Sequence, residues 1–334
     1  MKVLGIESSC DETAVAIVND NFQVSYSAVS SQVDLHRVFG GVVPEVAARA
    51  HLDMLAPMAA DLNNHQGHFD DIDAIAVTQG PGLIGSLLVG VSFAKGLALA
   101  LDKPLVPVDH VHAHIYGALL EQEKPTSFPA LALVASGGHT NLYYMASSLD
   151  FSLIASTIDD ACGECFDKVA KAMGFAYPGG PEIEKLAKEA TDFDLHMPKI
   201  VSEKSRMEFS YSGLKTHCIN LVRSEKFAKA DICHGFQKAA FDQIVRKISA
   251  ALELYPDSRS VIIAGGVAAN SYFKDELEKL PVPCTYPKLK YCSDNAAMIA
   301  ALGIETLKQE QHLENDLSWD VYARYDFGKW LRDV

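Results

Sequence analysis

Three histidines at alternating positions, His110, His112 and His114, are the residues of this chain most suited to chemistry. They directly follow Asp109, which is a good N-cap for a helix that begins there. In such a helix His110 and His114 lie on one face, one turn apart, as two imidazoles that share a metal ion would. His112 points to another side. The spacing predicts a metal-binding pair, although helical histidine pairs also arise by chance.

The same spacing occurs in the zinc-protease motif His-Glu-x-x-His, which would indicate a different activity. In that motif a glutamate follows the first histidine and acts as the general base. Val111 occupies this position here, so the sequence offers a metal pair without the hydrolytic base. Asp294, which precedes the apolar residues 296–300, is the candidate carboxylate for a His-His-Asp set. Its alternative role is to cap the helix that follows.

The composition indicates a globular protein with an acidic surface. The chain has 334 residues, of which 49% are hydrophobic, and a formal net charge of −14. It can form one large hydrophobic core or two moderate ones. The charge opposes non-specific binding of nucleic acid. Lys199, Lys204, Arg206 and Lys215 form a weak basic patch, although basic residues at this density are usually just solvated.

The sequence predicts a cytoplasmic location. No segment reaches the ~18 uninterrupted apolar residues of a membrane span, and residues 83–101 are interrupted by glycine, serine and lysine. The N-terminal residues resemble neither a secretory signal nor a transit peptide. The seven cysteines are scattered, which argues against a disulfide framework. Cys162 and Cys165 form a single C-x-x-C, which we interpret as two small buried residues.

Two polar turns, each between strand-like runs, resemble each other. Ser9 and Thr13 of the first turn, residues 7–13, recur at the same spacing in the second turn, residues 136–140. Such turns can offer hydroxyl and backbone N–H groups to a phosphate. The repeat predicts two similar lobes that face each other across a cleft.

The rest of the chain alternates between strands and helices, which indicates an α/β architecture. We expect a helix over residues 158–173 and a rigid Gly/Pro turn at residues 177–181, where a ligand could touch the backbone. A buried strand over residues 261–264 ends in Gly265-Gly266, with Asn270 at the start of a helix. This order is suited to a nucleotide that lies against the backbone and a helix N-terminus.

Together these motifs resemble the TsaD family, the catalytic subunit that makes N6-threonylcarbamoyladenosine in tRNA. The resemblance spans nearly the whole chain in the family's order, and such a set is highly specific. The matching segments are GIESSCDET (5–13), FGGVVPE (39–45), GPGLIGSLLVG (80–90), HVHAH (110–114), SGGHT (136–140), GECFDK (163–168), YPGGP (177–181), FSYSGLKT (209–216), GGVAAN (265–270) and SDNAAMI (293–299).

The resemblance implies an actin-like ATPase fold (the ASKHA fold of sugar kinases, Hsp70 and actin), with two similar lobes around a nucleotide and metal cleft. The N-terminal lobe would comprise residues 1–128 plus 295–334, and the C-terminal lobe residues 129–294. The resemblance assigns the metal to His110, His114 and Asp294. It assigns contacts with substrate or nucleotide to Val134, Ala135, Ser136, Gly137, Gly138, Asp167, Gly180, Glu184 and Asn270.

Some positions depart from the family pattern or have a less settled role. Glu184 stands where the family commonly has aspartate. Cys162 and Cys165 stand where the family usually has small residues, which supports their interpretation as buried core residues. Asp11 and Glu12 match positions that are implicated in catalysis.

The implied activity is that of an acyltransferase. It would transfer the threonylcarbamoyl group from threonylcarbamoyl-AMP to N6 of adenosine 37, in tRNAs that read codons starting with A, and release AMP. One divalent metal ion per subunit, Fe²⁺ or Zn²⁺, would act as Lewis acid and substrate anchor. ATP, ADP or AMP would fit the same nucleotide site. Asp11 or Glu12 would help to accept the proton from N6 or orient the threonyl part.

Two other functions fit parts of the pattern. A metalloprotease would need the missing glutamate. A kinase or regulatory ATPase of the same fold would hold Mg²⁺ mainly through carboxylates and phosphates, whereas this chain offers imidazoles.

The resemblance also implies partners. These are tRNA, a smaller TsaB-like paralogue that forms a heterodimer, a TsaE-like ATPase and an upstream threonylcarbamoyl-AMP synthase, with no membrane involved. We expect the bacterial form of the family. The Gly- and Ala-rich helix around residues 85–96 could pack against a partner, although internal packing is the alternative.

Overall fold

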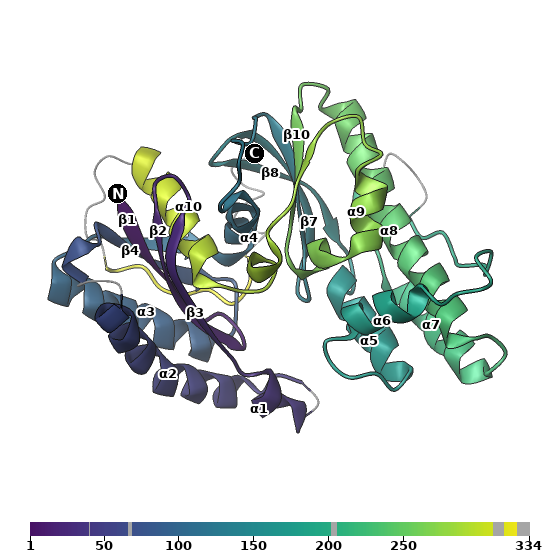
Figure 1. Cartoon of the computed structure of the whole chain (residues 1–334), viewed down its shortest axis with the longest axis horizontal. Helices are drawn as coiled ribbons and strands as arrows, with labels where there is room; N and C mark the ends of the chain where they lie inside the picture. The colour runs from purple at the N-terminus through teal and green to yellow at the C-terminus, as the bar shows by residue number, and fades with distance from the viewer. Residues whose placement is uncertain (40, 66–68, 202–205, 310–316, 326–334) are drawn as a thin grey trace. The chain divides into compact units, whose positions relative to one another are not determined.

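The computed structural model of the chain describes residues 1–39, 41–65, 69–201, 206–309 and 317–325. It forms two compact units, the first comprising Met1–Lys124 and Ser293–Val334 and the second Pro125–Cys292. Each unit has its own β-sheet and hydrophobic core (Figure 1). Gly40 and Lys204 of the patterns above lie outside the described residues, as do residues 310–316 and 326–334 of the predicted N-terminal lobe.

The first unit is built on a five-stranded sheet with the strand order β3-β2-β1-β4-β5. β1 pairs antiparallel with β2, and β2 with β3, whereas β1, β4 and β5 run parallel. Because the carboxyl ends of parallel strands meet at one edge, Glu7, Gly80 and Asp109 lie at the same edge of the sheet. The strands are β1 (Lys2–Glu7), β2 (Glu12–Asn19), β3 (Val24–Ser31), β4 (Ala74–Gly80) and β5 (Leu105–Asp109).

Helices cover both faces of this sheet (Figure 1). Alternate residues of β1 point to opposite faces. Leu4 and Ile6 point into a core that they share with apolar residues of α2 and α3. Gly5 faces α10, which packs so closely that a Cβ on Gly5 would lie 2.0 Å from the carbonyl oxygen of Ala296. The helices of this unit are α1 (Val33–Arg37), α2 (Pro44–His65), α3 (Ile84–Leu101), α4 (His110–Leu119) and α10 (Ala296–Gln309), with a short 3₁₀ turn η1 (Phe69–Asp71).

Among the described residues, α3 is the one helix whose length and composition would allow it to cross a membrane. It packs against α2 and β4, with Val91, Ala94 and Ala98 buried in the core of the unit. On its other side, Leu88 and Leu99 are exposed. A helix that buries one apolar side in a protein core has the same length and composition. We therefore explain α3 as a core helix with an additional apolar surface.

The second unit is built on a six-stranded sheet with the order β11-β10-β6-β7-β8-β9. β10 runs parallel to β6, and β6 pairs antiparallel with β7. The strands are β6 (Ala130–Ala135), β7 (Thr140–Ser147), β8 (Asp150–Thr157), β9 (Glu208–Phe209), β10 (Ser260–Ala264) and β11 (Cys284–Thr285). The helices are α5 (Cys162–Ala172), α6 (Gly179–Ala187), α7 (Ser212–Ser224), α8 (Lys229–Leu254) and α9 (Ser271–Leu277), with 3₁₀ turns η2 (Gly266–Ala269) and η3 (Leu289–Tyr291).

The two polar turns that resemble each other in sequence also occupy equivalent places. Each joins two antiparallel strands, β1 to β2 in the first unit and β6 to β7 in the second. In both units the sheet continues from this hairpin to a parallel strand, β4 or β10. The hairpin repeat predicted from the sequence is therefore present in the structure.

Two expected boundaries in the second unit were wrong. The helix expected from residue 158 begins at Cys162, because Asp159 accepts hydrogen bonds from Ser210 Oγ and Ser212 Oγ instead of joining a helix. The turn expected at residues 177–181 ends earlier, since α6 already begins at Gly179. Proline is tolerated in the first turn of a helix, so Pro181 does not prevent this start.

Replacing Gly5 by alanine tests the close packing of β1 against α10. The added methyl group collides with backbone, so we expect a loss of about 1–3 kcal/mol in the free energy of unfolding, measured by thermal and chemical unfolding. The matched control is Gly96→Ala in α3, where no atom lies within 4 Å of the added Cβ. That variant should be at least as stable as wild type, because alanine favours helix over glycine. Equal stability of Gly5→Ala and wild type would contradict the packing.

Candidate functional site

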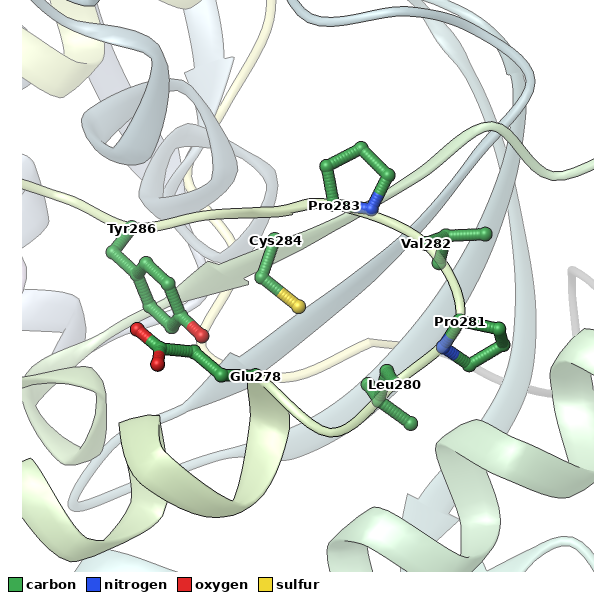
Figure 2. A pocket seen from close by; sticks show the side chains of 7 residues that line it. All are labelled: Glu278, Leu280, Pro281, Val282, Pro283, Cys284 and Tyr286. Atoms are coloured by element: carbon green, nitrogen blue, oxygen red, sulfur yellow. The ribbon is translucent and has the colours of Figure 1, made fainter.

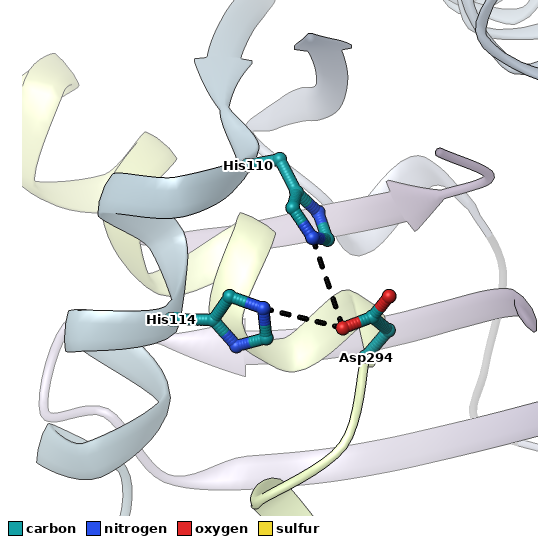
Figure 3. Close-up of side chains that lie close together, drawn as sticks. All are labelled: His110, His114 and Asp294. Atoms are coloured by element: carbon teal, nitrogen blue, oxygen red, sulfur yellow. Dashed lines mark ion pairs between the residues drawn. The ribbon is translucent and has the colours of Figure 1, made fainter. Parts of the chain in front are cut away.

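His110, His114 and Asp294 lie together within the first unit (Figure 3). The two imidazoles project from α4, and Asp294 lies two residues before α10. Nε2 of His114 is 3.2 Å and Nε2 of His110 3.7 Å from Oδ1 of Asp294. One ligand atom from each residue lies within 4.8 Å of the others, and both histidines are buried. The structure thus brings together the three residues to which the resemblance assigns a metal.

Local capping explains why these side chains converge. Asp109 is the N-cap of α4, and its Oδ1 accepts a hydrogen bond of 2.9 Å from the backbone N–H of His112. This starts the helix so that its histidine pair shares one face. At the other side Asn295 caps α10, because its Oδ1 accepts a 3.0 Å hydrogen bond from the backbone N–H of Met298. Asp294 is therefore not the cap, and its carboxylate turns toward the histidines (Figure 3).

Glu7, at the end of β1, contacts the imidazole of His110 at Nδ1, the ring nitrogen that does not face Asp294. Oε2 of Glu7 lies 3.1 Å from Nδ1 of His110 and accepts a 2.6 Å hydrogen bond from Thr78 Oγ1. Its Oε1 accepts one of 2.5 Å from the backbone N–H of Ser9. When Nδ1 donates to Glu7, Nε2 keeps a lone pair that faces Asp294. Sequence reasoning missed this role of Glu7. The signal that could have indicated it is the position of this glutamate directly after an apolar strand.

The electrostatics of this group favour positive charge. Burial raises the pKa of Glu7, but the neighbouring His110 outweighs burial and holds the pKa below its ordinary value. For His110, burial lowers the pKa, whereas the carboxylates of Glu7 and Asp294 raise it, to about 9. Two carboxylates therefore surround one imidazole in a buried place, a setting that attracts a cation.

The surroundings of the His114 ring indicate whether a metal ion fits this group. Both ring nitrogens of His114 are buried and make no hydrogen bond, and the one charged group beside them among the described residues is the Asp294 carboxylate, 3.2 Å from Nε2. A buried polar nitrogen without a partner is costly, by about 1–3 kcal/mol, and a bound cation would relieve that cost. Two imidazoles and one carboxylate also form a typical donor set for Zn²⁺ or Fe²⁺. The three residues could therefore hold a divalent metal ion.

Asp11 and Glu12 lie where the first polar turn enters β2. Asp11 is buried, and Oε1 of Glu12 is 3.3 Å from Ser31 Oγ. Burial and the negative charges of Asp294 and Asp11 raise the pKa of Glu12 to about 9. Glu12 consequently keeps its proton at neutral pH in the metal-free protein.

A buried histidine of α2 anchors this turn. Nδ1 of His51 lies 2.7 Å from Thr13 Oγ1, and Nε2 lies 3.0 Å from the carbonyl oxygen of Cys10. The backbone N–H of Gln32 donates a 2.8 Å hydrogen bond to the carbonyl oxygen of Asp11. The segment that carries Asp11 is thus held from two sides, and neither His51 nor Gln32 was expected from the sequence.

The second polar turn forms the start of the predicted nucleotide site in the second unit. Val134 and Ala135 end β6, and residues 136–138 form the turn that follows. A Cβ on either glycine of this turn would meet no atom within 4 Å. The carbonyl oxygen of Ser136 accepts a 3.1 Å hydrogen bond from the backbone N–H of Gly163, which starts α5 beside the turn.

Asp167 and Glu184 connect neighbouring helices. Oδ1 of Asp167 accepts a 2.7 Å hydrogen bond from the backbone N–H of Gly179, beside the predicted contact Gly180. Oε1 of Glu184 accepts hydrogen bonds from the backbone N–H and the hydroxyl of Ser271, at 3.0 and 2.5 Å. Burial raises the pKa of Asp167. Both carboxylates therefore have structural partners in addition to any ligand.

Asn270 lies beyond the end of β10, the strand that runs parallel to β6. It caps α9 by accepting a 2.9 Å hydrogen bond from the backbone N–H of Phe273, and its Nδ2 donates to Gln237 at 2.8 Å. Gly265 has a φ of +86°, and a Cβ there would lie 2.4 Å from the carbonyl oxygen of Ala135. Val134, Ala135 and residues 136–138 thus lie at the carboxyl end of β6, Asn270 follows β10, and Asp167, Gly180 and Glu184 lie on α5 and α6.

Two other features that the sequence singled out are the cysteine pair and the basic patch. Cys162 and Cys165 are fully buried, as predicted, and burial raises the pKa of Cys162 to about 12, which makes the thiol unreactive. In the weak basic patch, Arg206 pairs with Glu208, and Lys215 pairs with Asp160. A surface cavity of about 360 Å³ lies beside the end of α9, and none of its lining residues is a predicted site residue (Figure 2).

The comparisons with known proteins agree with the motifs. Residues 23–301 match the family model described as "TsaD: tRNA N6-adenosine threonylcarbamoyltransferase". The enzyme of that name from Moorella thermoacetica is 46% identical over 307 residues, covering 89% of each chain. That from Bacillus subtilis is 45% identical over 314 residues, covering 91% of this chain and 90% of the relative.

Solved structures confirm the predicted actin-like ATPase fold. Full-length HypF in its phosphate- and nucleotide-bound form matches with a TM-score of 0.61 and 15% identity, covering 93% of this chain and 56% of HypF. Component A of (R)-2-hydroxyglutaryl-CoA dehydratase from Acidaminococcus fermentans matches with a TM-score of 0.55 and 13% identity, covering 92% of this chain and 99% of component A. At these identities the likeness concerns the fold alone.

The raised pKa of Glu12 predicts how a Glu12→Gln variant responds to pH. A carboxyl group whose folded-state pKa is above its ordinary value of 4.5 stabilises the fold below that value, and this contribution is lost as pH rises toward 9. Glutamine does not titrate. In metal-free protein, the melting temperature of Glu12→Gln minus that of wild type should therefore increase between pH 5 and pH 9. The control is Glu45→Gln on the surface of α2, and a constant difference for both variants would contradict the assignment.

Proposed function

The chain belongs to the TsaD family of tRNA N6-adenosine threonylcarbamoyltransferases, and we propose that it carries out the reaction for which that family is named. The threonylcarbamoyl group moves from threonylcarbamoyl-AMP to N6 of adenosine 37, in tRNAs that read codons starting with A, and AMP is released. The observation that carries this proposal is the family match over residues 23–301, which includes the two histidines of α4. A cytoplasmic location fits this substrate.

His110, His114 and Asp294 hold one divalent metal ion, Fe²⁺ or Zn²⁺, in this proposal. When bound, it supplies a Lewis acid that polarises the carbamoyl carbonyl and anchors the substrate. The proposal is supported by the buried ring nitrogens of His114, which make no hydrogen bond, and by the donor set. Glu7 contributes by fixing the orientation of the His110 ring, as carboxylates behind metal-bound histidines do.

The acceptor amine needs help because its lone pair is delocalised into the purine. Asp11 or Glu12 either takes the proton that N6 loses or orients the threonyl part of the substrate. The raised pKa of Glu12 favours a division of these roles. A carboxyl group that keeps its proton at neutral pH can orient the threonyl part by donating a hydrogen bond to it.

The adenylate part of the substrate binds to the second unit in this proposal. Gly137 and Gly138 carry no side chain that would keep a phosphate away from the backbone of this turn. The N-terminus of α9, which Asn270 caps, favours negative charge nearby. Asp167, Gly180 and Glu184 complete the contacts, and ATP, ADP or AMP would occupy the same site.

Quantifying the modified nucleoside in cells tests the proposed reaction. Depletion of the protein should remove N6-threonylcarbamoyladenosine from digested tRNA, as measured by mass spectrometry. Wild type and His112→Ala should restore it, because His112 is not one of the three residues whose ligand atoms lie together. His110→Ala and Asp294→Asn should not restore it.

Two results would contradict the proposal. Restoration by His110→Ala to the wild-type level would rule out the metal group. Normal modification after depletion would mean that another enzyme suffices or that this protein has another function. The thermal stability of each purified variant serves as the control for folding.

The protein partners would be a TsaB-like paralogue, a TsaE-like ATPase and, upstream, a synthase of threonylcarbamoyl-AMP. The exposed side of α3 supports a protein interface. Ile84, Leu88 and Leu99 are exposed there, and no neighbouring atom would meet a side chain added at Gly96. Exposed apolar side chains beside small residues are typical of packed interfaces.

Placing charged side chains on this side of α3 should weaken heterodimer formation. Leu88→Glu and Leu99→Glu are expected to weaken binding of the TsaB-like paralogue by at least about tenfold, since each places a charge in an apolar contact, as measured by calorimetry. The melting temperature of the isolated chain should not change, because both side chains already face solvent. Leu254→Glu, at an exposed leucine of the other unit, is the control. Unchanged affinity would place the interface elsewhere.

A further inference from the structure

The tail segment, defined here as residues 317–325, returns to the first unit and reaches the start of α4. Three of its apolar residues, Leu317, Trp319 and Val321, pack against the core that contains the sheet. The ammonium group of Lys95 in α3 lies 4.5 Å from the centre of the Trp319 ring and donates a 2.8 Å hydrogen bond to its carbonyl oxygen. The segment is therefore a specific part of the fold.

The end of β4 holds the next part of the tail segment. Nε2 of Gln79 donates a 2.7 Å hydrogen bond to the carbonyl oxygen of Asp320. The backbone N–H of Tyr322 donates in turn to the carbonyl oxygen of Gln79, at 3.3 Å. Gly80 leaves the necessary space, because a Cβ there would lie 2.2 Å from the carbonyl oxygen of Tyr322. These contacts carry the tail segment along the edge where β4 and β5 end.

Two tyrosines of the tail segment converge on one carboxylate. The hydroxyl of Tyr322 donates a 2.6 Å hydrogen bond to Oδ2 of Asp109. The hydroxyl of Tyr325 lies 2.9 Å from Oδ1 and 2.8 Å from Oδ2 of the same residue. Oδ1 also accepts the capping hydrogen bond from the backbone N–H of His112. Both oxygens of the N-cap are thus held, from the helix and from the tail.

We propose that Tyr322 and Tyr325 are positioning residues for the metal group, because they fix the cap that sets the first turn of α4. This inference rests on the proposed function, in which His110 and His114 hold the metal. Asp109 immediately precedes His110, so a rotation of the cap moves the backbone of the first ligand. Metal–ligand distances tolerate deviations of only about 0.2 Å. The hydroxyls act through Asp109 and touch neither metal nor substrate.

The geometry also explains why two hydroxyls are needed. A carboxylate that caps a helix through one oxygen can rotate about its side-chain bonds and turn toward other partners. Nδ1 of His112 lies 3.7 Å from Oδ1 of Asp109 and is one such partner. With a tyrosine hydroxyl on each oxygen, the carboxylate stays in its capping orientation.

Titration of the chelator-treated, full-length protein with Co²⁺ tests this inference. Cobalt reports both affinity and ligand geometry, through its visible absorption bands. The variants are Tyr322→Phe, Tyr325→Phe and the double variant, which keep the packed rings and remove only the hydroxyls. Tyr26→Phe is the matched control, because Tyr26 Oη donates an equivalent 2.8 Å hydrogen bond to Asp61 in the same unit, away from α4.

The double variant should bind Co²⁺ about 10- to 100-fold more weakly, the range found for residues that orient metal ligands, with altered absorption bands. The single variants should fall between, and Tyr26→Phe should match wild type. Wild-type affinity and spectrum in the double variant would overturn the inference. A parallel titration of His110→Ala separates the two claims, since unchanged Co²⁺ binding there would instead overturn the metal assignment on which the inference rests.

Discussion

A completely buried carboxylate, that of Glu7, constrains the arrangement of the first unit. A buried charge is costly unless hydrogen bonds and an opposite charge compensate it. Here the compensation comes from three different segments: the hydroxyl of Thr78 in β4, the backbone N–H of Ser9 in the polar turn, and the imidazole of His110 in α4. The ends of β1 and β4 and the start of α4 must therefore meet at one point.

This constraint leads to a division of roles among neighbouring polar groups. His110 contacts Glu7 through Nδ1, which leaves its Nε2 available to a metal ion. Asp109 caps α4, whereas Asn295 caps α10 and leaves Asp294 available. Glu7, Asp109 and Asn295 therefore each have another hydrogen-bond partner. The result is a preorganised set of donors, which is what a site needs if binding is not to reorganise the fold.

Local patterns in the sequence were sufficient for part of this description. The i, i+4 spacing of His110 and His114 follows from helix geometry, and the hairpin turns follow from polar residues between apolar runs. Local patterns made Asp294 a candidate ligand and Asn270 a candidate nucleotide contact, but only the family resemblance assigned them to a common site, because no local pattern relates them to the histidines. The actin-like ATPase fold was predicted in the same way, and the solved structures confirm it.

Contacts between distant segments could not be predicted. Glu7 and His110 are 103 residues apart, and Gln79 and Asp320 are 241 residues apart. Whether the two residues of each pair meet depends on which strands are neighbours in the sheet. The helix start at Cys162 was missed for a similar reason, since the hydrogen bonds of Asp159 come from Ser210 and Ser212. Side chains that are paired across the fold leave little trace in local periodicity.

The central claim is that His110, His114 and Asp294 together hold a divalent metal ion. Anomalous X-ray diffraction from crystals of the metal-loaded protein, recorded on both sides of the metal's absorption edge, tests it most directly. We expect one strong anomalous peak within bonding distance of Nε2 of both histidines and of the Asp294 carboxylate. A peak at any other group of residues, or none at these three in protein that is active in transfer, would contradict it.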